Sequence, residues 1–136
     1  MPKILLVEDS KFLRIATERS LARAGYTVTS AGDGDEALRV ARESLPDLIL
    51  LDMLIPKTTG PDVLKALKQD PLTCPIPVVI ISALSQANAA RLQLDGALAF
   101  FEKSSLDLDK GSEKLLAALV EVFEKISPPQ GRGTTA

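Results

Sequence analysis

Short runs of apolar residues alternate along this chain with longer segments whose apolar residues recur at helical spacing. Runs of four or five consecutive apolar residues are typical of strands that are buried on both faces of a sheet. The run at residues 26–30 instead alternates with polar residues, which predicts a more exposed strand. The predicted strands cover residues 3–7, 26–30, 48–51, 78–81 and 97–101.

Helices are predicted between the strands from capping residues and apolar spacing. They run from Ser10 to Gly25, from Asp33 or Asp35 to about Ser44, over 62–69, over 86–94, and from the cap Ser112 to Ile126. The residues expected to face the core are Phe12, Ile15, Ala16, Leu21 and Ala22 in the first helix, Ala37, Leu38 and Ala41 in the second, Val63, Leu64 and Leu67 in the third, and Leu115, Leu116, Leu119, Val122, Phe123 and Ile126 in the last.

A strand followed by a helix, repeated along a chain of 136 residues, predicts a single α/β domain. Such a pattern gives a parallel sheet with right-handed crossovers and helices on both faces. We therefore expect a doubly wound sandwich over residues 1–127, followed by a disordered tail over residues 128–136, whose composition is poor in large apolar residues.

Composition narrows the possible functions. The net charge of -2 and pI of about 5.2 give no basic surface for direct nucleic-acid binding. The absence of histidine excludes Ser-His-Asp catalysis and histidine-ligated metal sites within the chain. The single Cys74 fits a reducing compartment, and no apolar run approaches the roughly 20 residues that span a bilayer. We expect a cytoplasmic protein without membrane insertion.

Polar side chains follow four of the predicted strands: Glu8 and Asp9, Asp52, Ser82, and Lys103. Each alone could be a helix cap, a turn residue or a solvated charge. Parallel strands, however, bring their carboxyl ends to one edge of the sheet, where ligands bind in open α/β folds. Carboxylates held together call for a cation, and hard oxygen ligands suit Mg²⁺. With a lysine and a hydroxyl beside them, these residues could place a phosphoryl group on Asp52.

This set of residues resembles the receiver domain of two-component response regulators over about residues 2–127. The resemblance rests on Glu8-Asp9, Asp52-Met53 with Pro56-x-x-x-Gly60, Ser82-Ala83 and Lys103. It implies a flavodoxin-like (CheY-like) fold, a (βα)5 three-layer sandwich with strand order 2-1-3-4-5. The phosphoryl donor would be a sensor histidine kinase or a histidine phosphotransfer protein.

The resemblance also implies roles for individual residues. Asp52 would accept the phosphoryl group, which Ser82 and Lys103 would contact. Mg²⁺ would be bound by Asp9, Asp52 and the backbone carbonyl of Met53, with Glu8 assisting through water. Ser82 and Phe100 would form the switch, and Phe101 is expected to be the better core residue by alternation.

Output is expected through protein contacts of the fourth helix, fifth strand and fifth helix, because no second domain follows in this sequence. Ser104 stands where the family usually has proline, which makes a cis peptide after Lys103 costly. Leu54 and Leu84 lie two residues beyond Asp52 and Ser82. Since neither can orient a water, we expect slow hydrolysis of the phosphorylated protein; the alternative is that the two leucines form a partner-binding patch.

Three other interpretations are open. A haloacid-dehalogenase-type phosphatase needs a second aspartate where Leu54 stands. A flavodoxin needs a hydroxyl- and glycine-rich phosphate loop where the acidic Val7-Glu8-Asp9 stands. A receiver that is never phosphorylated and serves only as an interaction module is the third, and the intact acidic set argues against it.

Overall fold

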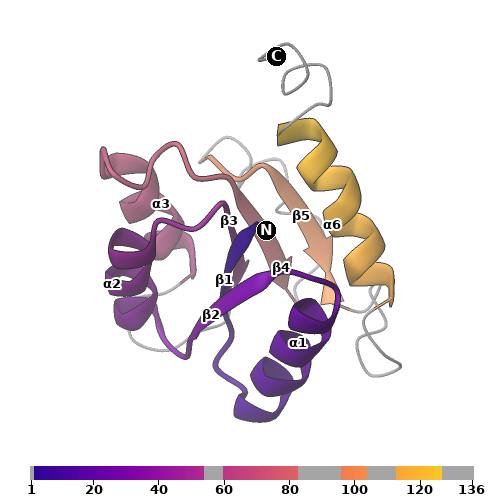
Figure 1. Ribbon diagram of the computed structural model, residues 1–136. Helices are drawn as coiled ribbons and strands as arrows, with labels where there is room; N and C mark the ends of the chain where they lie inside the picture. The colour runs from indigo at the N-terminus through magenta and orange to yellow at the C-terminus, as the bar shows by residue number, and fades with distance from the viewer. Residues whose placement is uncertain (1, 54–59, 83–95, 104–112, 127–136) are drawn as a thin grey trace.

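The computed structural model describes residues 2–53, 60–82, 96–103 and 113–126. The described chain forms one parallel sheet in the order β2-β1-β3-β4-β5, with helices on both of its faces (Figure 1). The elements are β1 (Lys3–Val7), α1 (Lys11–Arg23), β2 (Thr27–Ala31), α2 (Gly34–Ser44), β3 (Leu48–Asp52), α3 (Gly60–Gln69), β4 (Val78–Ser82), β5 (Ala99–Glu102) and α6 (Glu113–Ile126). The predicted flavodoxin-like fold and strand order are confirmed.

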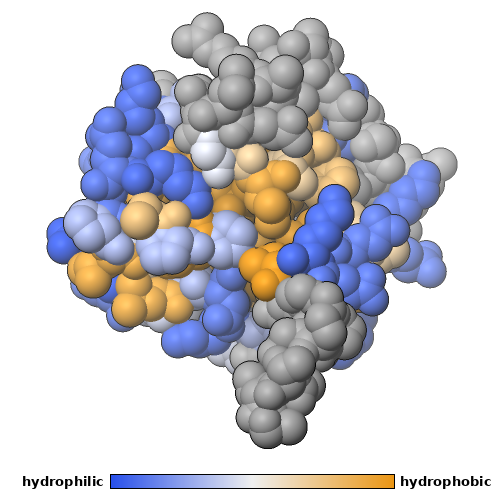
Figure 2. Space-filling model, turned by 90° about the horizontal axis from the view of Figure 1, so that it is seen from above, coloured by the Kyte–Doolittle hydropathy of each residue, from blue (hydrophilic) through white to orange (hydrophobic). Residues whose placement is uncertain are grey.

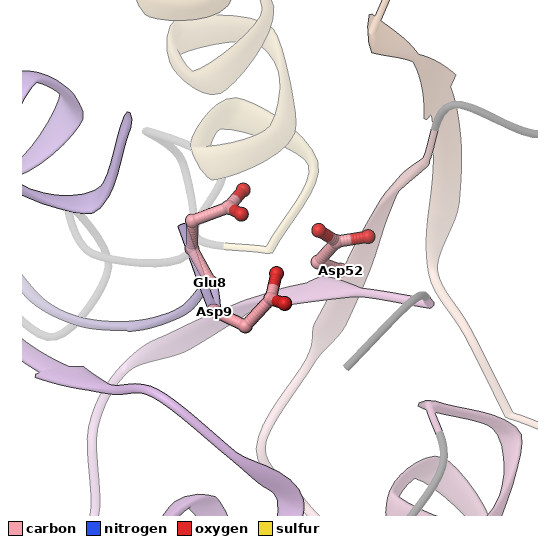
Figure 3. A group of neighbouring side chains, drawn as sticks. All are labelled: Glu8, Asp9 and Asp52. Atoms are coloured by element: carbon pink, nitrogen blue, oxygen red, sulfur yellow. The ribbon is translucent and has the colours of Figure 1, made fainter. Parts of the chain in front are cut away.

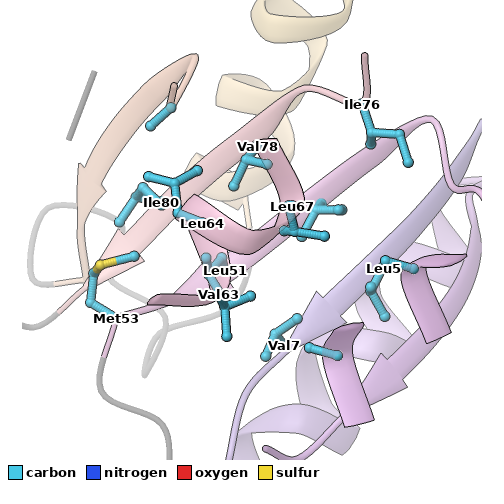
Figure 4. Close-up of a cluster of buried hydrophobic side chains, with 14 of the residues drawn as sticks. Leu5, Val7, Leu51, Met53, Val63, Leu64, Leu67, Ile76, Val78 and Ile80 are labelled. Atoms are coloured by element: carbon cyan, nitrogen blue, oxygen red, sulfur yellow. The ribbon is translucent and has the colours of Figure 1, made fainter. Parts of the chain in front are cut away.

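Alternating side chains divide the core into two layers, one on each face of the sheet. Leu5, Val7, Ile49 and Leu51 pack against α2 and α3, and their neighbours along each strand pack against α1 and α6. Figure 4 shows the first layer, in which side chains of β1, β3 and β4 meet those of α3. Because both faces are covered, β3 and β4 are buried along their whole length, as their unbroken apolar runs predicted.

Two predicted caps are present in the structure. The side chain of Ser10 accepts a hydrogen bond from the amide of Leu13 at 3.3 Å, at the start of α1. Of the two candidates for α2, Asp33 is the cap, and its carboxylate accepts from the amide of Glu36 at 2.8 Å. These short polar side chains satisfy amides that have no partner inside the helix.

The predicted apolar side of α1 was wrong except for Leu21, which is buried. Phe12 is 85% exposed, and Ile15 is also exposed. The residues that turn toward the sheet are half-buried Leu13 and buried Thr17 and Leu21, which lie four apart on one stripe of the helix. The polar Thr17 in the middle of this stripe hid it from a search for apolar periodicity. Ala16 and Ala22 are exposed as well.

The remaining helices follow their predicted faces. Leu115, Leu119 and Val122 of α6 are buried. The ring of Phe123 stacks on Tyr26, with centroids 5.5 Å apart and an interplanar angle of 21°. Tyr26 directly precedes β2, so this contact lies at the amino end of the strands and ties the last helix to the edge of the sheet. The expected helix over 86–94 and the expected tail lie outside the described residues.

The prediction that Phe101 would be the better core residue of β5 was also wrong. Phe100 is the more deeply buried, at 7% exposed, and belongs to the layer under α3. Phe101 is half-buried and packs against the layer under α6. Both faces of the strand accept an aromatic ring, so alternation alone could not rank the two side chains.

The surface carries hydrophobic side chains among hydrophilic ones. Figure 2 shows one such face, with hydrophobic residues near the middle of the view and hydrophilic residues on either side. Over the described residues, the exposed large hydrophobic side chains are Phe12, Ile15, Leu45, Leu72, Leu98 and Val120. Among the described helices, none combines the length and the apolar character needed to cross a membrane.

Candidate functional site

The carboxyl edge of the sheet gathers acidic side chains from two neighbouring strands. Glu8 and Asp9 follow β1 directly, and Asp52 is the last residue of β3. Figure 3 shows their three carboxylates turned toward a common space. One carboxylate oxygen from each residue lies within 4.8 Å of the others. The structure therefore brings together the three acidic residues that were predicted to meet.

The three carboxylates differ in their access to water. Glu8 is 5% exposed and Asp52 is 4% exposed, whereas Asp9 is exposed. Oxygen ligands from two buried groups and one open group suit Mg²⁺, which takes one or two carboxylates and keeps several waters. The donor set thus fits the metal that the sequence predicted.

Lys103 crosses this edge from the end of β5 and neutralises part of the acidic charge. Its ammonium nitrogen lies 2.9 Å from Oε1 of Glu8 and 2.9 Å from Oδ2 of Asp52. Burial by itself would lower the pKa of Lys103, but the hydrogen bonds to Asp52 and Glu8 outweigh burial and raise that pKa. The lysine is therefore held in its charged form beside Asp52.

Glu8 is fixed at both carboxylate oxygens. Oε1 pairs with Lys103, and Oε2 accepts a hydrogen bond from the amide of Ser10 at 3.1 Å. Burial raises the pKa of Glu8, and the nearby charge of Asp52 raises it further, while the bonds from Lys103 and Ser10 lower it; the net direction is upward. Ionisation of Glu8 is therefore less favourable in the folded protein than in water.

Of the other predicted site residues, only some lie within the described parts of the chain. Ser82 ends β4 beside β3 and is fully buried, and Met53 directly follows Asp52 and is buried. Phe100 lies two residues before Glu102, whose register partner is Ser82. Leu54, Leu84 and the peptide between Lys103 and Ser104 involve positions outside the described residues.

Two residues that sequence reasoning left without a structural role support the site. A Cβ built on Gly60, the first residue of α3, would lie 2.5 Å from Cα and 2.6 Å from the carbonyl oxygen of Met53. Only glycine leaves room there, and the spacing Pro56-x-x-x-Gly60 was its sequence signal. Arg14 on α1 donates from Nη1 to the carbonyl of Glu8 at 2.9 Å. In the sequence, Arg14 looked like any charge on a helix, and no local signal would have singled it out.

Comparison with known proteins identifies the family. The family model described as the response regulator receiver domain matches residues 4–115. The chemotaxis response regulator CheY4 of Vibrio cholerae superposes with a TM-score of 0.80 at 30% sequence identity, covering 90% of this chain and 98% of that one. The fold described above therefore has a close structural counterpart.

Curated relatives agree with this assignment. The alkaline phosphatase synthesis transcriptional regulatory protein PhoP of Bacillus subtilis is 45% identical over 74 residues, which are 54% of this chain and 31% of that protein. A putative transcriptional regulator of Pseudomonas aeruginosa is 36% identical over 133 residues, which are 96% of this chain and 61% of that protein. The chain thus spans only part of the length of these relatives. It belongs to the response regulator receiver domain family of two-component signal transduction.

Proposed function

We propose that Asp52 accepts a phosphoryl group from the phosphohistidine of a sensor histidine kinase or a histidine phosphotransfer protein. The observation that carries this proposal is the position of Asp52: buried at the carboxyl edge of the sheet, 2.9 Å from the ammonium of Lys103 and among two further carboxylates. An oxygen of Asp52 forms the new bond to phosphorus as the phosphorus–nitrogen bond of the donor breaks. Family membership supports this reaction for the chain.

The neighbouring residues would stabilise the charge that gathers on the phosphoryl oxygens. Mg²⁺ would be held by Asp9, Asp52 and the carbonyl of Met53, with Glu8 assisting through water; when bound, it neutralises the carboxylates and the phosphoryl group. Lys103 is charged and already beside Asp52, so it can pair with a phosphoryl oxygen. The hydroxyl of Ser82, at the end of the adjacent strand, can donate to another.

Phosphorylation would act as a switch on protein contacts. The modified group brings about -1.5 to -2 charge, by analogy with other protein phosphates. Movement of Ser82 toward it, followed by Phe100, would change the surface around β5 that a downstream protein reads. Phe100 is buried under α3, so any change in its ring position would be felt in the packed layer around it.

The direct test is incubation with acetyl phosphate and Mg²⁺, followed by intact mass measurement. The wild-type protein should gain the mass of one phosphoryl group, and chelation of Mg²⁺ should prevent the gain. Asp52→Asn should remain folded and gain nothing. A phosphorylated Asp52→Asn variant would show that another residue accepts the group, and Asp9 would be the first to examine.

A further inference from the structure

Asp9 differs from the other two carboxylates because its side chain has no partner among the described residues. Glu8 and Asp52 are both held by Lys103. No hydrogen bond or ion pair reaches the exposed side chain of Asp9 from the described parts of the chain. The main chain that carries Asp9 therefore sets the point and the orientation from which its side chain starts.

The main chain of Glu8, the residue before Asp9, is held by a hydrogen bond at its amide and another at its carbonyl. The amide of Glu8 donates to the carbonyl of Ala31 at 3.0 Å, which continues the pairing of β1 with β2. The carbonyl of Glu8 accepts from Nη1 of Arg14 at 2.9 Å. Because that carbonyl and the amide of Asp9 share one planar peptide unit, fixing the carbonyl fixes the orientation from which Asp9 extends.

A glycine makes room for this guanidinium group. A Cβ built on Gly32 would lie 2.9 Å from Nη1 and 3.6 Å from Cζ of Arg14. The amide of Gly32 in turn donates to Oε1 of Glu36 at 2.8 Å, which holds the loop between β2 and α2 in place. Arg14 of α1 therefore lies between the main chain directly after β1 and the loop that connects β2 to α2.

We propose that Arg14 is a positioning residue for the metal site: it orients Asp9 toward Mg²⁺ by holding the carbonyl of Glu8, and Gly32 provides the space that this contact requires. The inference rests on the proposed function, in which Asp9 is a ligand of Mg²⁺.

Charge and position predict opposite effects for Arg14. A positive charge beside an acidic site repels a cation, so its removal would by electrostatics alone strengthen Mg²⁺ binding. Loss of a positioning hydrogen bond would weaken Mg²⁺ binding, by roughly tenfold if it acts like other outer-shell contacts at the weaker end of their range. The sign of the change thus separates the two roles.

The experiment is an NMR titration with Mg²⁺ of the wild type, Arg14→Met, Arg14→Lys and Gly32→Ala. Arg14→Met should bind Mg²⁺ about tenfold more weakly, and Arg14→Lys, which keeps the charge but loses the fork geometry, should fall between. Gly32→Ala keeps the charge of Arg14 and displaces its guanidinium, so it should also bind more weakly. Arg19→Met, an exposed change on the same helix, is the matched control and should bind as wild type does.

A second readout needs no metal. In the metal-free protein, the amide resonance of Asp9 should move in Arg14→Met and Gly32→Ala but not in Arg19→Met, while thermal unfolding shows that each variant is folded. A wild-type protein whose Glu8, Asp9 and Asp52 resonances ignore Mg²⁺ would overturn the proposed metal site and this inference with it. A normal wild-type titration with equal or tighter binding in Arg14→Met would overturn the inference alone.

Discussion

At the scale of single residues, the site holds three carboxylates against one ammonium group in contact with two of them. In the metal-free protein, Lys103 thus supplies part of the positive charge that a bound cation would otherwise supply. Carboxylates this close repel one another unless a positive charge is near. The stability of the metal-free protein should therefore depend on Lys103.

Lys103→Met should lower the free energy of unfolding of the metal-free protein by about 2 kcal/mol, less than for a fully buried pair because Lys103 retains some exposure. Millimolar Mg²⁺ should return part of this loss, since it supplies the missing positive charge. Urea unfolding followed by circular dichroism, with and without Mg²⁺, measures both effects. Lys65→Met, an exposed change on α3, is the control; equal stability of the two variants would contradict the prediction.

The raised pKa of Glu8 gives a dependence of stability on pH with a definite sign. A carboxyl whose pKa is higher in the folded than in the unfolded protein binds more protons when folded. Its contribution to stability is full below the ordinary value of 4.5 and is lost as the pH rises through the raised pKa.

Glu8→Gln mimics the protonated carboxyl of Glu8, so this variant should not lose stability as the pH rises through the raised pKa. In the presence of a chelator, the free energy of unfolding of the wild type should fall relative to that of Glu8→Gln as the pH rises above 4.5. Denaturant unfolding at a series of pH values provides the comparison. Parallel pH profiles of the two proteins would mean that Glu8 titrates alike in both states.

At the scale of elements, Gly60 at the start of α3 lies against the main chain of Met53, directly after β3. The absent side chain of Gly60 allows α3 to begin against Met53. Gly60→Ala should destabilise the protein by about 1–3 kcal/mol, the usual cost of forcing extra atoms into a packed position. Thermal or urea unfolding tests this, with Pro61→Ala, an exposed neighbour, as control. An unchanged Gly60→Ala protein would show that α3 can shift freely.

The elements also show which parts of the fold can be predicted from sequence patterns. Unbroken apolar runs were sufficient for β1, β3 and β4, because strands buried on both faces have no polar positions to confuse the pattern. Apart from Leu21, the buried face of α1 was missed because its contact with the sheet is one narrow stripe with a threonine at its centre. The order of burial within β5 was missed because both faces of that strand are apolar.

At the scale of the whole molecule, the parallel topology assembles the site from distant parts of the chain. Lys103 meets Glu8 across 95 positions and Asp52 across 51. That the strand ends would converge could be predicted, because every strand points the same way. The sequence could not predict which side chains pair or that Arg14 donates to the carbonyl of Glu8. These contacts depend on the conformations of the loops and helix termini around this edge of the sheet.

The stack of Tyr26 on Phe123 gives the protein a spectroscopic property of its own. The chain has one tyrosine and no tryptophan, so fluorescence excited in the tyrosine absorption band comes from a single ring. That ring reports the contact between α6 and the sheet at the end of the strands remote from the acidic residues. Emission should therefore change when α6 separates from the sheet, remain constant while Mg²⁺ is added, and change in Phe123→Leu even in the folded state. In one sample, tyrosine emission can thus follow the separation of α6 from the sheet, and the NMR resonances of Glu8, Asp9 and Asp52 can follow the binding of Mg²⁺.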